Sequence, residues 1–249
     1  MQYNLPPLPI KRCVIAVLTG VLVVFATHSL LYTTAFHGLG EEDGFAESGG
    51  ALCFLGSAIS FFWLFLQLRR RPESTPHDLG AWWWYIILAA LFVFITGEEI
   101  SWGQRIFGWA TPEWMAENNV QEETTIHNLE IFNAHTKDHE LKPFWQSLLT
   151  MNRLFSLFWL SWCLVLPLAV RFVPIIAKIT GWFRVPIPNV VYGCVFFTAY
   201  ATTKAFVMMN DPEEKILAQT DEIKEAFFAL LLLLVAIDFV KRYRASTSA

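Results

Sequence analysis

Long apolar runs recur along the chain and are separated by shorter polar stretches. A run of about 20 apolar residues is long enough to cross a hydrocarbon core of about 30 Å as a helix. The pattern therefore predicts an all-α, polytopic membrane protein, a bundle of about six transmembrane helices within a single integral membrane domain. The expected spans cover residues 13–34, 47–68, 81–98, 152–171, 188–209 and 225–240.

Prolines mark the fourth and fifth expected spans. Pro167 and Pro174 lie in or just after the fourth run, where a proline removes a helical hydrogen bond, so a kink or an end is predicted there. Pro186 and Pro188 precede the fifth run, and proline is tolerated in the first turn of a helix. Residues 99–151 form the largest stretch outside the spans. They mix aromatic and acidic residues, which predicts short amphipathic helices on the membrane surface.

The composition supports a membrane location. The chain is 55% hydrophobic and 16% charged, compared with roughly 45–50% and about 25% in soluble domains. The net charge of −4 gives no basis for nucleic-acid binding. The four cysteines are far apart, all lie in apolar runs and lack metal-type spacing, so we expect them to be packing residues.

The first apolar run follows Lys11 and Arg12, an arrangement that secretory signal peptides share. The run is longer than the apolar part of a typical signal peptide, and no A-x-A cleavage motif follows it. We therefore expect it to be the first span. His28 within it is expected to be a hydrogen-bonded packing residue.

The positions of Lys and Arg predict the orientation, because cytoplasmic loops hold the positive excess. Basic clusters flank the spans at residues 11–12, 69–71, 171–184 and 241–244. All four clusters fall on one side of a six-span topology. We therefore expect a plasma-membrane protein with both termini in the cytoplasm.

Acidic residues gather on the opposite side, which receives residues 35–46, 99–151 and 210–224. The acidic and histidine residues that map to this face are Glu41, Glu42, Asp43, Glu47, Glu98, Glu99, His127, Glu130, Asp221, Glu222 and Glu225. Packed like charges repel each other unless protons, basic groups or a cation intervene. The sequence therefore predicts either a recess that binds a proton or cation, or acids that are dispersed in water.

Glu98 and Glu99 follow the third apolar run without a break. An ionised carboxylate at membrane depth is costly unless it is paired, hydrated or bound to a cation. This favours a role as general base or ligand over the alternative that both residues simply mark the water interface. If the helix continues, Glu98, Ser101 and Arg105 share one face, and Arg105 offsets one charge.

Lys204 is an unusual charge within the fifth run, six residues before Asn210. At ~1.5 Å per residue it lies roughly 9 Å from the end of the span. Two interpretations are open. The lysine forms an ion pair with Glu98, Glu99 or Glu225 in the bundle, or it reaches up to the lipid headgroups.

Glu123, His127 and Glu130 would share one stripe of a helix. Imidazole and carboxylate groups together suit Zn²⁺ or a harder divalent ion, so these three are candidate metal ligands. His135 and His139 add a second pair. Neither set matches an established metal motif, and a solvated polar face is the alternative.

Residues 97–108, with the sequence GEEISWGQRIFG, continue through residues 111–113 to His127 and Asn128. This stretch resembles the signature of a family of uncharacterised bacterial multipass inner-membrane proteins. The resemblance implies a bacterial inner membrane and brings no activity with it.

The expected function is that of a membrane-embedded enzyme with an outward-facing carboxylate and histidine site, with or without a divalent metal, acting on a lipid or lipid-linked substrate. The expected catalytic residues are Glu98, Glu99 and His127. The expected substrate- or ion-binding residues are Arg105, Lys204, Glu222, Glu225 and Glu47. The alternatives are proton- or cation-coupled transport and an assembly role. Transport would need a polar path, whereas the cytoplasmic halves of the spans are mostly apolar.

Overall fold

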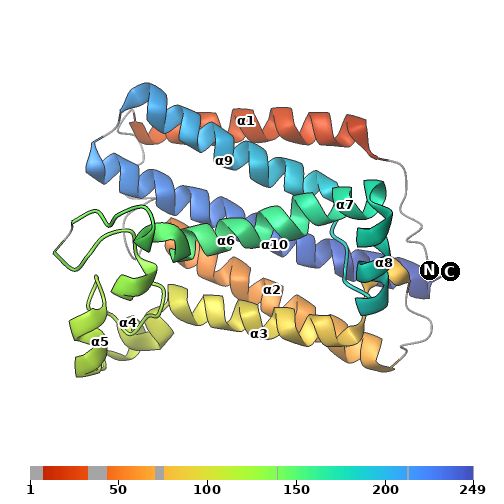
Figure 1. Cartoon of the computed structure of the whole chain (residues 1–249), viewed down its shortest axis with the longest axis horizontal. Coiled ribbons are helices and arrows are strands. Elements are labelled where there is room, and N and C mark those ends of the chain that lie inside the picture. Colours follow the sequence, from red (N-terminus) through yellow and green to blue (C-terminus); the bar gives the residue numbers. More distant parts are fainter. Residues whose placement is uncertain (1–7, 33–43, 71–75, 139, 212, 249) are drawn as a thin grey trace.

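The computed structural model of the protein describes residues 8–32, 44–70, 76–138, 140–211 and 213–248. Within these ranges the chain is helical, apart from loops and two isolated β-bridges. The long helices run along one common direction (Figure 1), and α1 begins and α10 ends at the same end of the bundle. We call this the terminal end. The opposite end, which carries α4 and α5, is the loop end.

Five helices among the described residues are long and apolar enough to cross a membrane. They are α1 (Ile10–Tyr32), α2 (Phe45–Arg70), α3 (Trp82–Glu99), the continuous segment Met151–Phe172, and α9 (Val190–Asn210). Each begins and ends within a few residues of a predicted span. The prediction of a helical multipass bundle is confirmed at this level.

The sixth predicted span, residues 225–240, lies inside a longer helix, α10 (Glu214–Thr247). This helix begins well before the apolar run, so Asp221 and its acidic neighbours lie on helical turns and not in a loop before the helix. Charged residues flank the run and Asp238 interrupts it. For this reason α10 is not among the five helices above.

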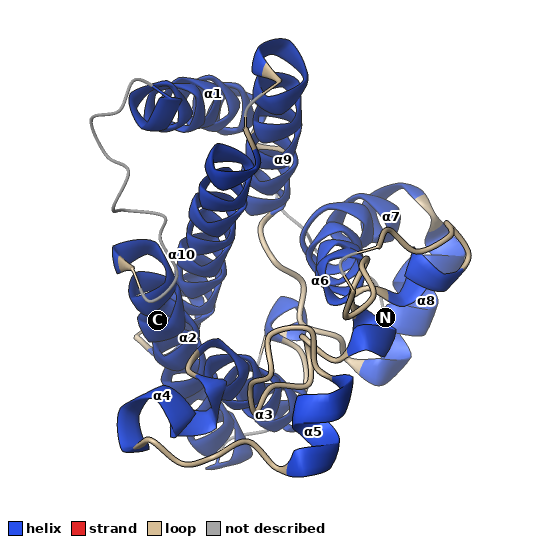
Figure 2. Cartoon of the chain, turned by 90° about the vertical axis from the view of Figure 1, so that its left-hand side faces the viewer, coloured by secondary structure: helices blue, strands red, loops and turns tan. Residues whose placement is uncertain are grey.

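Figure 2 views the bundle from its loop end and shows α1, α9, α10, α2 and α3 in a row. Each helix packs on the next in this order, and the Met151–Phe172 segment packs beside the row against α9. α10 is therefore the central helix. Its loop-end turns face α2 on one side, and its other side packs on α9.

Aromatic side chains fill the middle of the bundle. The fully buried phenylalanines are Phe61, Phe92, Phe196, Phe228 and Phe239. Trp159 stacks on Phe196 with ring centroids 5.2 Å apart, and Trp162 stacks on Phe239 at 6.1 Å. Burial of large rings supplies most of the packing energy that such a core offers.

Pro167 does not end the fourth span, because the helix continues through it. α6 (Met151–Trp159) runs into a π-helical segment, η7 (Leu160–Val165), and then into α7 (Leu166–Phe172). Pro167 has no N–H to donate to the carbonyl of Cys163, as an α-helix would require. A π segment is a local adjustment that keeps such a helix continuous.

The neighbours of η7 explain how the chain leaves this region. A methyl group on Gly193 of α9 would overlap the carbonyl of Cys163, so glycine allows the two helices to approach. Pro174 begins α8 (Pro174–Phe183), as proline in a first turn allows. Asn189 caps α9 by accepting a hydrogen bond from the backbone N–H two residues later, at 3.1 Å.

The segment between α3 and α6 covers the loop end (Figure 1). Its helical elements are η4 (Ser101–Gly103), α4 (Gln104–Phe107), α5 (Glu113–Asn118), η5 (Glu130–Phe132) and η6 (Gln146–Leu149). The predicted short helices are thus present. A helix over residues 123–130 is not formed, because this stretch consists of turns and bends up to η5.

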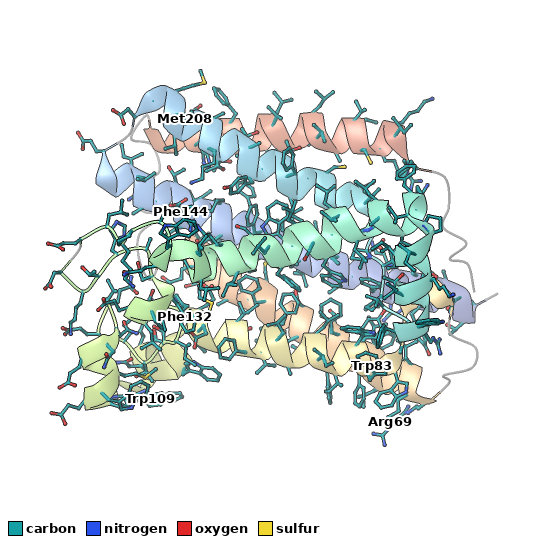
Figure 3. The ribbon with its side chains drawn as sticks, viewed as in Figure 1. Arg69, Trp83, Trp109, Phe132, Phe144 and Met208 are labelled. Carbon is teal, nitrogen blue, oxygen red and sulfur yellow. The ribbon has the colours of Figure 1, made fainter. Side chains whose placement is uncertain are left out.

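Aromatic side chains lie at both ends of the bundle. Figure 3 shows Trp83 at the terminal end and Trp109 at the loop end, as expected where a helix bundle meets the two interfaces of a bilayer. The terminal end is also held by Arg242 of α10. Its Nη1 donates to Asp78 of η3 (His77–Leu79) at 2.9 Å.

Candidate functional site

The end of α3 leads into a left-handed turn. Ser101, Trp102 and Gly103 have φ angles of 47°, 51° and 85°, a region that residues other than glycine rarely adopt. The turn folds Trp102 back so that its ring lies against Gly97. The indole Nε1 then donates a hydrogen bond to Oε1 of Glu98 at 2.6 Å.

Glu98 is buried, with 5% of its surface exposed. Its Oε2 accepts hydrogen bonds from the backbone N–H groups of Ile126 and His127, both at 2.7 Å. Nδ1 of His127 lies 3.1 Å from the same oxygen. A buried carboxylate is tolerated when it is paired and hydrogen-bonded in this way. These bonds join Glu98 to the loop that carries His127. The predicted role of Glu98 as general base or ligand stays a prediction.

Buried polar groups fix the loop of residues 119–128. The side-chain amide of Asn119 is fully buried, and it donates to the carbonyl of Thr125 at 2.8 Å. The Oε1 of Gln104, in α4, accepts from the backbone N–H of Thr124 at 2.7 Å. The loop that carries His127 is therefore held independently of Glu98 as well.

Arg105 clamps this loop to α2. Its Nη1 donates to Oε1 of Glu47 at 2.6 Å, and its Nη2 donates to Oε1 of Glu123 at 2.8 Å. The hydroxyl of Ser101 donates to the other oxygen of Glu123 at 2.9 Å. The prediction that Glu98, Ser101 and Arg105 share a helical face is wrong, because the left-handed turn ends the helix between them.

The predicted metal stripe is also absent. Because residues 123–129 are not helical, Glu123, His127 and Glu130 do not share a helical face, and the first two bind different partners. Among the residues that the structure describes, no group of three or more His, Cys, Asp or Glu side chains could hold a metal ion. The Zn²⁺ hypothesis therefore has no structural support. His139, of the second histidine pair, lies outside the described residues.

Carboxylates from three helices meet beside the loop. Glu47 of α2 and Glu99 of α3 line a pocket of about 170 Å³ together with Arg105. Glu222 and Glu225 of α10 are close enough to interact electrostatically with Glu99. We call these four glutamates the acidic pocket. The remaining acids expected at this surface before α2 lie outside the described residues: Glu41, Glu42 and Asp43.

Glu99 and Glu225 are the two members of the acidic pocket that lack a direct partner among the described residues. Of these, Glu99 lies in the pocket beside Arg105. Protein encloses most of its side chain, and it forms no hydrogen bond or ion pair with any residue that the structure describes. Arg105, the nearby basic group, is bound by Glu47 and Glu123. Like charges gathered in one recess are relieved by a proton or by a bound cation.

His127 is positioned between Glu98 and the acidic pocket. Its Nδ1 faces Glu98, and its ring is close enough to interact electrostatically with Glu225. The side chain is 37% exposed. Nδ1 is occupied, whereas no described residue hydrogen bonds Nε2, so this second nitrogen can still donate or accept a hydrogen bond.

Lys204 is not part of this site. It lies on α9 with an exposed side chain, and Nζ is 6.0 Å from the centroid of the Tyr200 ring. No ion pair forms between Lys204 and any described residue, so the predicted bond to Glu98, Glu99 or Glu225 is absent. Its exposure fits the other interpretation, a lysine that reaches the headgroups.

His28 joins α1 to α9. It is fully buried, and its Nε2 lies 2.9 Å from the hydroxyl oxygen of Thr203. Its ring also packs on Phe206, with centroids 5.4 Å apart. These contacts agree with the predicted role of a hydrogen-bonded packing residue.

An apolar groove of about 470 Å³ runs along α2 and α3. Its lining includes Leu55, Ala58 and Phe62 of α2, Ala90 of α3, and Trp102. Trp102 is thus shared between the groove and the hydrogen bond to Glu98, which places the polar site and the groove next to each other.

Sequence reasoning missed Trp102 and Asn119. Trp102 was not singled out, because nothing in the local sequence shows that the helix ends in a left-handed turn. The one available signal is the pair Gly97 and Gly103, which leave room for the ring and for a positive φ angle. Asn119 gave no signal, since its burial depends on contacts within the loop.

Comparison of the chain with known protein families, with curated proteins and with solved structures finds no match. The chemistry of the site therefore rests on its own residues. These are an oriented imidazole, a buried carboxylate that holds it, and an acidic pocket beside an apolar groove.

Proposed function

We propose that the protein is an enzyme of the bacterial inner membrane that cleaves or transfers a headgroup ester of a membrane lipid or lipid-linked substrate. The observation that carries this proposal is the hydrogen bond between Nδ1 of His127 and the buried carboxylate of Glu98. A carboxylate on Nδ1 fixes the tautomer and orientation of an imidazole whose Nε2 can then accept a proton.

The proposed topology has six spans, with α10 as the sixth and both termini in the cytoplasm. α10 supports this because it is the central helix and packs on two of the helices that can cross the membrane, α2 and α9. In this orientation the loop end, with its acids, faces away from the cytoplasm. The active site then lies at the headgroup level, where ester bonds of lipids are found.

The proposed step is a general-base reaction. Nε2 of His127 takes a proton from water, or from an acceptor alcohol, as the oxygen of that molecule forms a bond to the carbonyl carbon or phosphorus of the ester. The bond to the leaving oxygen breaks, and this oxygen takes a proton from a protonated carboxyl of the acidic pocket. Glu225 is the group we assign to that proton transfer.

The other residues of the site have supporting roles in this proposal. Glu98 positions the imidazole, and Arg105 holds the loop against Glu47. Glu222 adds charge to the acidic pocket. The middle of the bundle is filled by buried aromatic rings, which disfavours the alternative of transport along a polar path between the two faces.

The test is turnover of lipids by the purified chain in vesicles of phosphatidylethanolamine and phosphatidylglycerol, with products identified by mass spectrometry. We expect His127→Ala to lower the rate by about 10²–10⁴-fold, the usual contribution of a positioned general base. His135→Ala is the matched control, because His135 is an exposed histidine of the same segment and does not contact Glu98. Its rate should equal that of the wild type.

Glu98→Gln separates positioning from folding. An amide cannot accept hydrogen bonds on both of its heavy atoms, so the imidazole loses its orientation. We expect a lower maximal rate and an altered pH–rate profile, whereas Glu117→Gln on the exposed surface of α5 should change neither. Absence of any lipid product in the wild type, or equal rates for the two histidine variants, would rule out the proposed enzyme.

A further inference from the structure

The acidic pocket and the apolar groove follow each other along one face of α2. Ser48 and Ala51 line the pocket, and Leu55, Ala58 and Phe62 line the groove. These positions are spaced by three or four residues, which places them on one side of a helix. The two recesses therefore form one continuous surface. It is polar at the loop end and apolar farther along α2, toward the terminal end.

The dimensions of this surface match one lipid leaflet. From Ser48 to Phe62 the surface extends roughly 21 Å along α2 at ~1.5 Å per residue, of which roughly 10 Å is the groove. A hydrocarbon core of about 30 Å gives each leaflet roughly half of that depth. The groove begins roughly 10 Å from Ser48 along α2 and ends roughly 21 Å from it, so it lies deeper than the headgroup level and reaches the middle of the bundle, where the end of an acyl chain lies.

The groove can hold a flexible chain because its lining combines small and large apolar residues. Ala58 and Ala90 leave space between α2 and α3, and Phe62 and Trp102 contribute aromatic walls. Ala90 is exposed, so the space beside it opens to the lipid side of the bundle and not to the core. An acyl chain can enter such a groove from the bilayer without unfolding the helices.

The polar end of this surface favours a positively charged group. Glu99 is largely enclosed and has no direct partner among the described residues. It lines the same pocket as Glu47 and is close enough to Glu222 and Glu225 to interact electrostatically. The guanidinium of Arg105 is already held by two carboxylates. An ammonium group would relieve the repulsion between these acids, whereas an anionic headgroup would add to it.

We infer that this face of α2 and α3 binds one phospholipid with an ammonium headgroup, with an acyl chain in the groove and the ammonium between Glu47 and Glu99. The inference rests on the proposed function in one respect: it names this lipid as the class of substrate. The binding itself does not require turnover. His127 then lies beside the headgroup, where its Nε2 can reach an ester.

Native mass spectrometry of the full chain in detergent tests the binding, with phosphatidylethanolamine and phosphatidylglycerol as probes. The wild type is expected to retain one phosphatidylethanolamine and to bind phosphatidylglycerol at least about tenfold more weakly, the ratio that 1.4 kcal/mol gives. Glu99→Gln should remove this preference. Ala90→Phe should reduce the binding of both lipids, because the added ring occupies the groove.

Ala201→Phe is the matched control, since Ala201 is an exposed alanine on α9, outside the groove. It should bind lipid as the wild type does, and the thermal unfolding of all three variants shows that they are folded. Equal affinity of the wild type for both lipids, or unchanged binding by Ala90→Phe, overturns the inference.

The same measurement on His127→Ala separates binding from catalysis. Selective binding of phosphatidylethanolamine without turnover by the wild type supports this inference and contradicts the proposed function. Turnover of both lipids at equal rates, without selective binding, supports the proposed function and contradicts this inference.

Discussion

At the scale of single residues, the site depends on the buried carboxylate of Glu98, which a left-handed turn joins to Trp102 and which a separate loop joins to Ile126 and His127. Ser101 and Trp102 adopt left-handed backbone conformations, each of which costs about 1–3 kcal/mol in a residue other than glycine. The bonds that Glu98 accepts from Trp102, Ile126 and His127 offset this cost. Strain of this kind is concentrated at functional sites. Here it places the indole of Trp102 on the carboxylate that also contacts His127.

Gly97→Ala is expected to destabilise the loop end. A Cβ atom at this position would lie 2.8 Å from the ring of Trp102, so the ring must shift and its hydrogen bond to Glu98 weakens. Overpacking of this type costs about 1–3 kcal/mol, which thermal unfolding in detergent measures. Gly49→Ala on α2 is the control, because no atom lies within 4 Å of the added methyl. If both variants unfold at the wild-type temperature, Trp102 does not pack on Gly97.

Two adjacent glutamates show where sequence reasoning succeeds and where it stops. Glu98 and Glu99 both follow an apolar run, so a costly position for a carboxylate was predictable for both. Their different environments were not predictable, because Glu98 is satisfied by a loop 28 residues later and Glu99 faces α2 and α10. Similarly, the spacing of Glu123, His127 and Glu130 predicts a stripe only if a helix forms, and turns form there instead.

At the scale of elements, the close contact between η7 and α9 links an irregular helix to its neighbour. Pro167 removes one helical donor, and the π segment exposes the carbonyl of Cys163 toward Gly193. Trp162 in the same segment donates from Nε1 to the carbonyl of Pro186 at 3.1 Å. The irregular segment is thus fixed by contacts with α9 and with the loop that precedes it.

Gly193→Ala is expected to separate α9 from η7. The added methyl would overlap a backbone carbonyl, which cannot rotate away as a flexible side chain can. We therefore expect a loss of about 3 kcal/mol, at the upper end of the usual cost of overpacking. Gly20→Ala on α1 also adds a methyl facing α9, but its nearest neighbours are side-chain atoms at 3.7 Å. Thermal unfolding in detergent should show a clear loss for the first variant and little for the second. Equal losses would contradict the assigned contact.

The positions of the five apolar helices were predictable because an apolar run of about 20 residues has the length that a helix needs to cross the hydrocarbon core of a bilayer. The length of α10 was not, since its first turns are polar and resemble a loop when taken alone. The π segment was also hidden, because a proline in a long apolar run predicts a disturbance without saying which one. The close packing of this segment against Gly193 of α9, which the sequence does not show, accompanies the π-helical conformation.

At the scale of the whole molecule, charged side chains distinguish the two ends of the bundle. The loop end carries the acidic pocket, and the terminal end carries Arg242 with its bond to Asp78. The gathering of Glu47, Glu99 and Glu225 was predictable from topology alone, because an alternation of spans brings these sequence-distant acids to one face. The sequence does not predict that the three acids lie close together. They do so because α10 packs as the central helix of the bundle.

The proposed six-span topology predicts that α5 and the end of α10 lie on opposite sides of the membrane. If α10 did not cross, the chain would end on the same side as α5, so the two arrangements differ in one observable. Glu117→Cys and Ser248→Cys place exposed thiols at these two positions, in a chain whose four native cysteines are replaced by alanine. A membrane-impermeant thiol reagent should label residue 117 in right-side-out vesicles and residue 248 in inside-out vesicles. Labelling of both thiols from one side would show that α10 does not span, and the positive charges after residue 240 would then lie on the same side as the acidic pocket.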